Sequence, residues 1–449
     1  MKLLKYIILL AIPLLLATSC KKFLDVKPKG VIIAETLSDF EGLLNATAVV
    51  NPFGLNNLII YPTDDLSDPS FSLQSQSSPK GNAYFWYEYI NNTSVRPDLW
   101  ADVYRQIANL NVVTEGVLNA TDGTEQQRRQ LYAEAVVAKV YNYQHLISFF
   151  APAYGKTTAG ADFGVPYVTS TDVSDAVPER PVLQAQYDRL LADLLTAVPE
   201  LPESNVNNTR VTRYVAYGLL SRLYMSMMDY ENALKYADLA LGNGKAAILD
   251  YGQYAGAQLP ATNSSPEELF VRYCNNTSFR YSDELLSKFD LNNDLRIRLL
   301  ASRRTDGSYN YGSQQLYNPN RGITYAEIYL NKAECLARAG RINDALDIVN
   351  NVIRKKRFAT DKYVALTAVN TEAAIRAVLD ERRRELAFKG VRWIDMKRLD
   401  KEGRMPAVAR MDKSGTAVLT SLSPGSAGYT FQIPLMVQSF NAGMPLNKK

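Results

Sequence analysis

The chain has 449 residues, of which 47% are hydrophobic and 21% charged, and its formal net charge is +4. This composition is typical of a folded protein with two or three lobes and not of a disordered chain. A single histidine, His145, stands against 28 tyrosines, which excludes zinc sites built on several histidines. A nucleic-acid-binding surface is also unexpected, because the chain has no large excess of positive charge.

The first 19 residues are predicted to be a secretory signal peptide. Lys2 and Lys5 precede an apolar stretch of twelve residues, which is too short to span a bilayer that needs ~20. Cys20 follows three small residues and resembles the lipidated cysteine of bacterial lipoproteins. Loss of residues 1–19 removes two lysines from the net charge of +4 and leaves +2. We expect a nearly neutral exported protein anchored by acyl chains on Cys20, and ordinary secretion with an incidental cysteine is the alternative.

Residues 20–97 are predicted to form a lipidated N-terminal segment that is rich in loops. Turn formers such as Asn51-Pro52 and Asp68-Pro69 recur along it, and only one short helix is predicted, near Leu37–Leu44.

Residues 98–242 are predicted to form an N-terminal helix-repeat part. Asp98 is a suitable N-cap for a first helix, and Thr124 with Gln127 predicts a capping box for a second one that ends before Pro152. The helices predicted in this part before the repeat are 98–118, 124–150 and 186–198.

Two segments share one residue spacing and lie 112 residues apart. From Ser221 and from Ala333, small or apolar residues recur at offsets 3, 7, 12, 16 and 19, except that the first segment has a tyrosine at offset 3. This spacing predicts two antiparallel helices joined by a tight turn in each segment, with small residues where the helices touch. The pattern resembles the tetratricopeptide repeat.

The second of these segments has the clearer boundaries. Thr324 and Glu327 predict a capping box, and Gly340 stands where the first helix of the pair must end. Glu334 and Arg338 are spaced for an i,i+4 ion pair on a polar stripe of that helix. Residues 321–449 are therefore predicted to be a C-terminal helix-repeat part with an irregular tail.

Residues 243–320 are predicted to be a loop-rich insertion with short strands that contributes to a ligand site. Aromatic residues gather there and in a second cluster at 84–89. Aromatic faces stack on the apolar faces of sugars, and tyrosine hydroxyls form hydrogen bonds at the rim. The candidate ligand-binding residues are Trp86, Tyr84, Tyr281, Tyr309 and Tyr311, with plain core packing as the alternative for each.

Motifs for catalysis or metal binding are weak. His145 lacks a second histidine and is expected to be a packed side chain. Asp290 begins a stretch like an EF-hand loop, but Leu295 occupies the position that requires glycine. The basic run 381–385 is flanked by acids and is interpreted as a solvated or ion-paired helix end, while Asp64-Asp65 is expected to point its two carboxylates apart. We expect no catalytic residue, no cofactor and no metal site.

Several motifs along the chain together carry a resemblance to a known family. They are the start Cys20–Val26, Trp100–Asn111, Gly164–Tyr167, the repeat around Ala333, and Glu381–Phe388 with Gly390, Trp393, Asp395 and Arg398. In combination they resemble SusD/RagB-like nutrient-binding outer-membrane lipoproteins. The C-terminus departs from the family pattern, because Leu435–Gln438 replaces the acid-bearing continuation that follows Ile433-Pro434.

The resemblance implies a mainly α fold: a tetratricopeptide-like helix-repeat scaffold with loop-rich insertions and a few short β-strands. It implies a non-catalytic, lipid-anchored outer-membrane protein exposed on the cell surface. Such proteins capture oligosaccharides and deliver them to a SusC-like TonB-dependent transporter, and Trp86 is carried over by its regional position. The alternatives are an envelope tetratricopeptide-type adaptor that binds peptides or proteins and, below it, a glycoside hydrolase with paired carboxylates.

Overall fold

A computed structural model describes residues 34–51, 58–73, 78–172, 174–254, 257–274, 278–312, 320–359 and 361–448. The predicted signal peptide, the lipidated Cys20 and the family-like start of the mature chain lie outside the described residues. The structure is 49% helical and 8% strand, which confirms the mainly α class. Among the described residues, no helix has the length and apolarity needed to cross a membrane.

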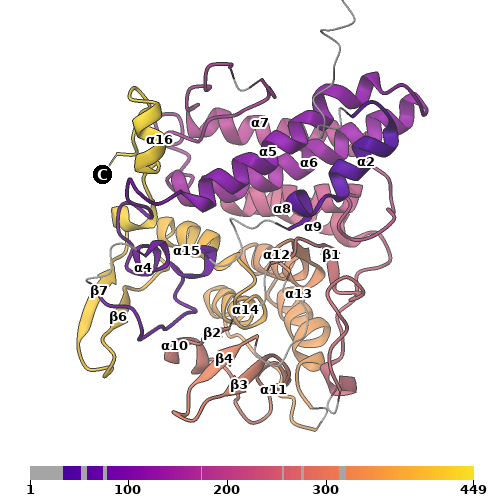
Figure 1. The fold of residues 1–449 in the computed structure, drawn as a ribbon. Helices are drawn as coiled ribbons and strands as arrows, with labels where there is room; N and C mark the ends of the chain where they lie inside the picture. Colours follow the sequence, from indigo (N-terminus) through magenta and orange to yellow (C-terminus); the bar gives the residue numbers. More distant parts are fainter. Residues whose placement is uncertain are drawn as a thin grey trace, which may run out of the picture.

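A series of helices forms one continuous stack, in which each helix packs against the next (Figure 1). The members in this order are α5 (Asp98–Gly116), α6 (Glu125–Phe150), α7 (Leu183–Ala197), α8 (Arg213–Ser226), α9 (Tyr230–Leu241), α12 (Tyr325–Arg338) and α14 (Thr371–Glu385). The capping box of α6 is confirmed, since Thr124 and Gln127 exchange both of its hydrogen bonds. Asp98 is the first residue of α5 and not its N-cap, which is Pro97.

The two segments with the shared spacing are helical hairpins. In the first, α8 and α9 are separated by a three-residue turn, and in the second α12 is followed by α13 (Ile342–Asp347). Offset 7 falls on the turn in both copies, where Met228 has φ 58° and Gly340 has φ 77°. A left-handed residue ends a helix at this position. The second copy differs beyond α13, because its chain continues as a π-helix over Ile348–Ile353.

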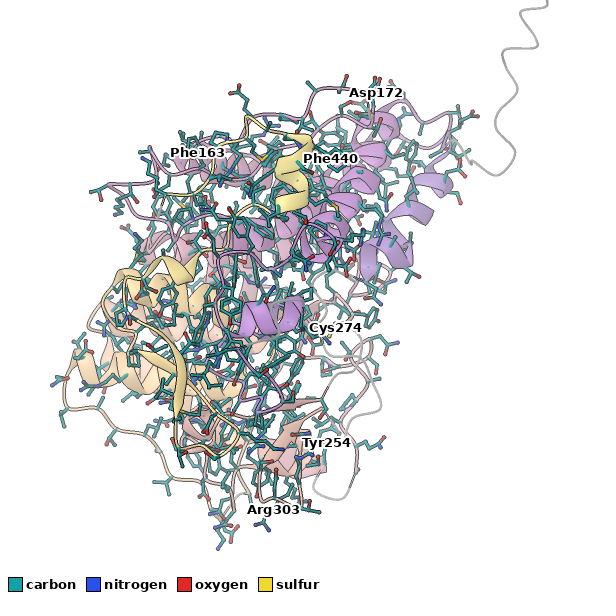
Figure 2. All side chains as sticks on the ribbon, turned by 60° about the vertical axis from the view of Figure 1, so that its left-hand side comes forward. Phe163, Asp172, Tyr254, Cys274, Arg303 and Phe440 are labelled. Carbon is teal, nitrogen blue, oxygen red and sulfur yellow. The ribbon has the colours of Figure 1, made fainter. Side chains whose placement is uncertain are left out.

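Shorter elements complete the fold around this stack. The helices are α2 (Leu37–Asn45), α3 (Thr47–Val50), α4 (Pro79–Tyr84), α10 (Asp283–Leu286), α11 (Leu295–Leu300), α15 (Arg392–Lys401) and α16 (Leu435–Phe440). Three small antiparallel sheets have the strand orders β1-β5 (Glu268–Phe270, Ile323–Thr324), β2-β4-β3 (Phe279–Arg280, Tyr309–Tyr311, Ala301–Arg303) and β6-β7 (Val408–Met411, Val418–Leu422). In Figure 2, Tyr254 and Arg303 lie in the lower part of the molecule, and Cys274 lies at middle height.

The charged end of α14 is buried, which corrects the part of our interpretation that allowed it to be solvated. Side chains 381–385 are all at most 9% exposed. Glu381 accepts hydrogen bonds from Arg296 and Arg354 at 2.7 and 2.8 Å. Glu385 accepts from Arg357 at 2.6 Å. Burial alone raises the pKa of Glu381, but the surrounding guanidinium groups outweigh it and hold the pKa well below its ordinary value.

Three residues of the predicted polar stripe of α12, Glu327, Asn331 and Glu334, are also buried and do not face solvent. Thr324 caps the helix by accepting from the Glu327 backbone N–H, but the Glu327 side chain binds Arg222 instead of closing the capping box. Glu334 is 0% exposed and accepts two hydrogen bonds from Arg398, at 2.6 and 2.7 Å. Its i,i+4 pair with Arg338 is present at 2.8 Å.

Glu334→Gln should lower the free energy of unfolding by about 3–5 kcal/mol, because it removes the carboxylate that accepts two hydrogen bonds from the buried Arg398 guanidinium and leaves Asp395 as its remaining partner. Glu372→Gln is the matched control, since Glu372 also pairs with an arginine, Arg404, but its side chain is 48% exposed. The control should cost about 0–1 kcal/mol. Urea unfolding followed by circular dichroism measures both, and equal losses would contradict the interpretation.

Candidate functional site

Two of the predicted aromatic residues hold a buried arginine between them. Tyr84 and Trp86 are 3% and 8% exposed. The Arg410 guanidinium lies 4.0 Å from the centroid of the Tyr84 ring and 4.4 Å from that of Trp86. Its N–H groups donate to the backbone carbonyls of Tyr61, Thr63, Leu66 and Tyr84, each at 2.9 Å.

The predicted aromatics of the central insertion form a second cluster. Tyr281 and Tyr311, 2% and 8% exposed, have ring centroids 4.9 and 5.0 Å from that of Phe388. Tyr309 is half-buried on β4, the central strand of the β2-β4-β3 sheet, opposite Arg303 of β3. A series of ring contacts through Phe71, Tyr61 and Phe279 links the two clusters.

This burial matches the core-packing alternative for four of the five candidates. Neighbouring side chains pack against Tyr84, Trp86, Tyr281 and Tyr311, so these rings are mostly part of the core. A role in ligand binding stays a prediction for all five, and of these Tyr84 also lines the cleft described next.

The first open surface is a cleft of 580 Å³ between strand β6 and helices α10 and α14, which we call the β6 cleft. Figure 1 shows the β6-β7 hairpin beside these helices in the lower left of the molecule. The apolar part of its lining comes from Leu379, Met405, Val408 and Met411. Its charged floor consists of Asp64, Arg383 and Arg392.

Asp64 and Asp65 do not point apart as we expected, because both reach the same arginine. Arg383 donates to the Asp65 carboxylate at 3.0 Å and lies 3.3 Å from that of Asp64. Arg392 binds Asp64 through two hydrogen bonds of 2.7 Å. Burial and the neighbouring Asp64 charge raise the pKa of Asp65 to about 6, although Arg383 opposes this shift. The pair is therefore a structural ion cluster that joins the N-terminal segment to α14 and α15.

The second open surface is a groove of 440 Å³ with an uncharged lining, which we call the neutral groove. It lies where α2 and α3 meet the loop before α8 and the segment after β1. The lining residues are Asn45, Thr47, Val50, Asn51, Asn207, Thr209 and Tyr273. Asparagine amides, threonine hydroxyls and one phenol supply both donors and acceptors, and Val50 with the tyrosine ring supplies apolar surface.

Local backbone bonds fix the walls of the neutral groove. The Tyr273 N–H donates to the Val50 carbonyl at 3.1 Å, and the Asn207 carboxamide oxygen accepts from the Thr209 N–H at 2.9 Å. The Oδ1 atom of Asn51 is buried and has no hydrogen-bond partner among the described residues. Burial raises the pKa of Tyr273, so its hydroxyl remains a donor at neutral pH. Sequence reasoning noted Tyr273 among the aromatics of the insertion but did not select it, and it missed the asparagines and threonines because uncharged polar residues give no distinctive pattern.

His145 is a packed side chain, as expected. It is 1% exposed and its ring lies edge-on to Tyr141, with centroids 4.7 Å apart. Burial, with smaller effects from the charges of Arg222 and Arg321, lowers its pKa to about 3. In the described ranges, no group of three or more His, Cys, Asp or Glu side chains is placed to hold a metal ion.

Comparison with known families agrees with this fold. A family model described as "Starch-binding associating with outer membrane" matches residues 22–225, and the model of the SusD family matches residues 259–427. The helix-repeat fold and these two matches together place the chain in a class of proteins that is associated with the outer membrane. The chain belongs to the SusD family.

Individual relatives are distant. The chain is 22% identical to SusD-like protein P25 of Formosa agariphila over 62% of its own length and half of that protein's length. It is 21% identical to SusD-like protein P2 of the same organism, over 69% of this chain and 74% of that one. The crystal structure of a SusD superfamily protein from Bacteroides vulgatus is 20% identical and superposes with a TM-score of 0.72, covering 92% and 99% of the two chains. The structural likeness establishes the shared fold.

The imidazole of His145 should not titrate between pH 8 and pH 5. Because burial keeps the folded pKa near 3, the unfolded chain binds more protons between pH 6.5 and 3, and the free energy of unfolding falls as the pH falls through this window. One histidine gives one imidazole signal in a proton NMR spectrum, which makes the measurement direct. The urea-unfolded protein is the control and should titrate near pH 6.5. A shift of the native signal between pH 8 and pH 5 would contradict the burial.

Proposed function

We propose that this protein captures uncharged oligosaccharides in the neutral groove and delivers them to a SusC-like TonB-dependent transporter. Membership of the SusD family supports carbohydrate binding at the outer membrane. The observation that carries the proposal for this chain is the absence of charged side chains among the described residues that line the groove.

A neutral sugar needs hydrogen bonds and one apolar face more than an electric field. The hydroxyls of a sugar act as donors and acceptors, and amide side chains match both functions. The unpartnered Asn51 oxygen is an acceptor that a ligand hydroxyl can satisfy. The ring of Tyr273 offers a surface for the apolar face of a sugar, and its hydroxyl offers a donor.

The same lining supports binding without hydrolysis. Cleavage of a glycosidic bond requires two carboxyl groups about 5–10 Å apart, one of them an acid. The groove is lined by no carboxylate and no histidine within the described residues. The buried pair Asp64-Asp65 is occupied by arginines and does not line this groove.

Capture at the cell surface also requires an anchor and a partner. In this proposal, acylated Cys20 holds the mature protein in the outer membrane, since several acyl chains together give a stable anchor. The helix stack then serves as a rigid body that a transporter can bind. The competing function is that of an envelope adaptor for peptides or proteins. Such an adaptor would copurify with other envelope proteins and would not require a transporter.

Tyr273→Ala should weaken the binding of a neutral hexasaccharide at least tenfold, because it removes the stacking face and one donor. Isothermal titration against maltohexaose, cellohexaose, xylohexaose, laminarihexaose and mannohexaose identifies the ligand and then measures the loss. Tyr132→Ala is the matched control, since Tyr132 is 37% exposed on α6 and does not line the groove. Equal binding by the Tyr273→Ala variant and the wild type would place the site elsewhere.

Detergent extraction of the wild-type protein should copurify a TonB-dependent transporter, and Cys20→Ser should remove the protein from the membrane fraction. The reason is that serine cannot form the thioether that carries the acyl chains. Radiolabelled palmitate incorporation checks the lipid directly, and Lys22→Gln is a control that keeps the thiol. Copurification with other envelope proteins and no transporter would favour the adaptor.

A further inference from the structure

We propose that the β6 cleft is a second binding site, which takes the backbone of a free oligopeptide of about four residues as an added antiparallel strand. This goes beyond glycan capture in the neutral groove, because it is a different cavity with a different ligand chemistry. Three observations carry it: an unpaired strand edge, an apolar middle, and two unpaired charges of opposite sign.

The strand edge comes first. The cleft is lined by seven consecutive residues, 405–411, whereas no residue of β7 lines it. Strand β6 is hydrogen-bonded to β7 on one side, so the cleft follows the other side of β6. Within the described residues, that edge has no strand partner. Free N–H and C=O groups on such an edge bind an extended peptide backbone.

The charges come second. Most of the charged side chains that line the cleft are already paired, as in Lys288 with Asp380 at 2.8 Å. Arg376 on α14 and Asp283 at the start of α10 are both exposed, and neither forms an ion pair with any residue in the described ranges. Glu372, which lies one helical turn before Arg376, is held by Arg404 through bonds of 2.7 and 3.0 Å.

The two charges lie at opposite ends of the cleft. Arg383 is next to α10, since it forms an ion pair with Glu284. It is seven residues after Arg376 on the same helix, which corresponds to ~10 Å along the axis. An extended chain advances ~3.4 Å per residue, so a tetrapeptide spans this distance, and a volume of 580 Å³ accommodates one.

The direction of β6 fixes the orientation of the ligand. Just before β6, Arg404 donates a hydrogen bond to Glu372 at the start of α14. Within β6, Arg410 then donates to the carbonyl of Leu66. Leu66 follows Asp64, whose carbonyl binds Arg383 near the end of α14. Strand β6 therefore runs in the same sense as α14, from the Arg376 end to the Asp283 end.

An antiparallel ligand runs the opposite way. Its N-terminal ammonium group then lies beside Asp283, and its C-terminal carboxylate lies beside Arg376. A parallel ligand would place both of its end charges against like charges. The middle of the peptide faces the side chains of Leu379, Met405, Val408 and Met411, so apolar or β-branched residues suit the central positions.

The test uses isothermal titration of the full mature protein with the free peptide Thr-Val-Thr-Val. The free peptide should bind at least tenfold more tightly than the form that is N-acetylated and C-amidated. Fully N-methylated peptide, which lacks backbone donors, should bind at least tenfold more weakly. Binding of the capped or the N-methylated peptide as tight as that of the free one would overturn the proposal.

Variants assign the two ends. Asp283→Asn should abolish the preference for a free N-terminus over an acetylated one, and Arg376→Gln should abolish the preference for a free C-terminus over an amide. Both positions are exposed, and Lys413→Gln in the β6-β7 turn is the matched control that should keep both preferences. If each variant instead removed the preference at the other end of the peptide, the antiparallel orientation would be wrong.

A last arm separates this site from the neutral groove. Tyr273→Ala should leave peptide binding unchanged, and the hexasaccharide that binds the wild type best should not compete with the peptide. Competition between the two ligands would contradict a second site. Peptide binding with no glycan binding would reject the proposed function and support this inference alone.

Discussion

The last five residues of α14, 381–385, are all charged and all buried, so their pairing decides where the neighbouring elements can lie. Glu381 and Glu385 bind arginines from α11 and from the end of the second hairpin. Arg382 binds Asp395 of α15 and Asn331 of α12. Arg383 binds the N-terminal segment at Asp65. One short stretch of helix therefore contacts the insertion, the repeats and the N-terminal segment.

Such a cluster is a means of specifying one arrangement more than a source of net stability. The desolvation of each buried charge costs several kcal/mol, and the attraction between partners roughly repays it when the geometry is good. A buried carboxylate that loses its arginine still carries the desolvation cost but no longer has the attraction that offsets it. Alternative packings of the helix stack would separate these partners, so the cluster penalises them. The β6 cleft benefits, since Arg383 holds α14 against the N-terminal segment at Asp65 and both Asp64 and Arg383 line the cleft.

Periodic patterns predicted the helices most clearly where a helix has local signals at its ends. Thr124 with Gln127, and Gly340 at a left-handed turn, are examples in which neighbouring residues decide the outcome. In the first hairpin, Met228 adopts the left-handed conformation that Gly340 adopts in the second. In the sequence, only the shared spacing indicates that Met228 has this role. The aromatic candidates were harder, because a tyrosine in a loop sequence gives no sign of whether its ring is covered. Tyr281 is covered by Phe388, which lies more than a hundred residues later.

The neutral groove and the β6 cleft could not be predicted for a related reason. Each is made by segments that are distant in the sequence, such as Asn51 with Asn207, or Asp283 with Val408. No single segment has an unusual composition. The repeat pattern fixed the position of the scaffold helices, whereas the open surfaces depend on long-range contacts of the loops that lie on them.

The span of these contacts bears on how the chain acquires its structure. Arg383 contacts Asp65 across 318 residues, and Arg410 contacts Tyr61 across 349. Contacts between residues so far apart form slowly, because a large loop must close first. The N-terminal segment is synthesised early, and its partners follow only when most of the chain has been made. A nascent chain lacks these long-range contacts for most of its synthesis, which would suit the export before folding that the predicted signal peptide implies.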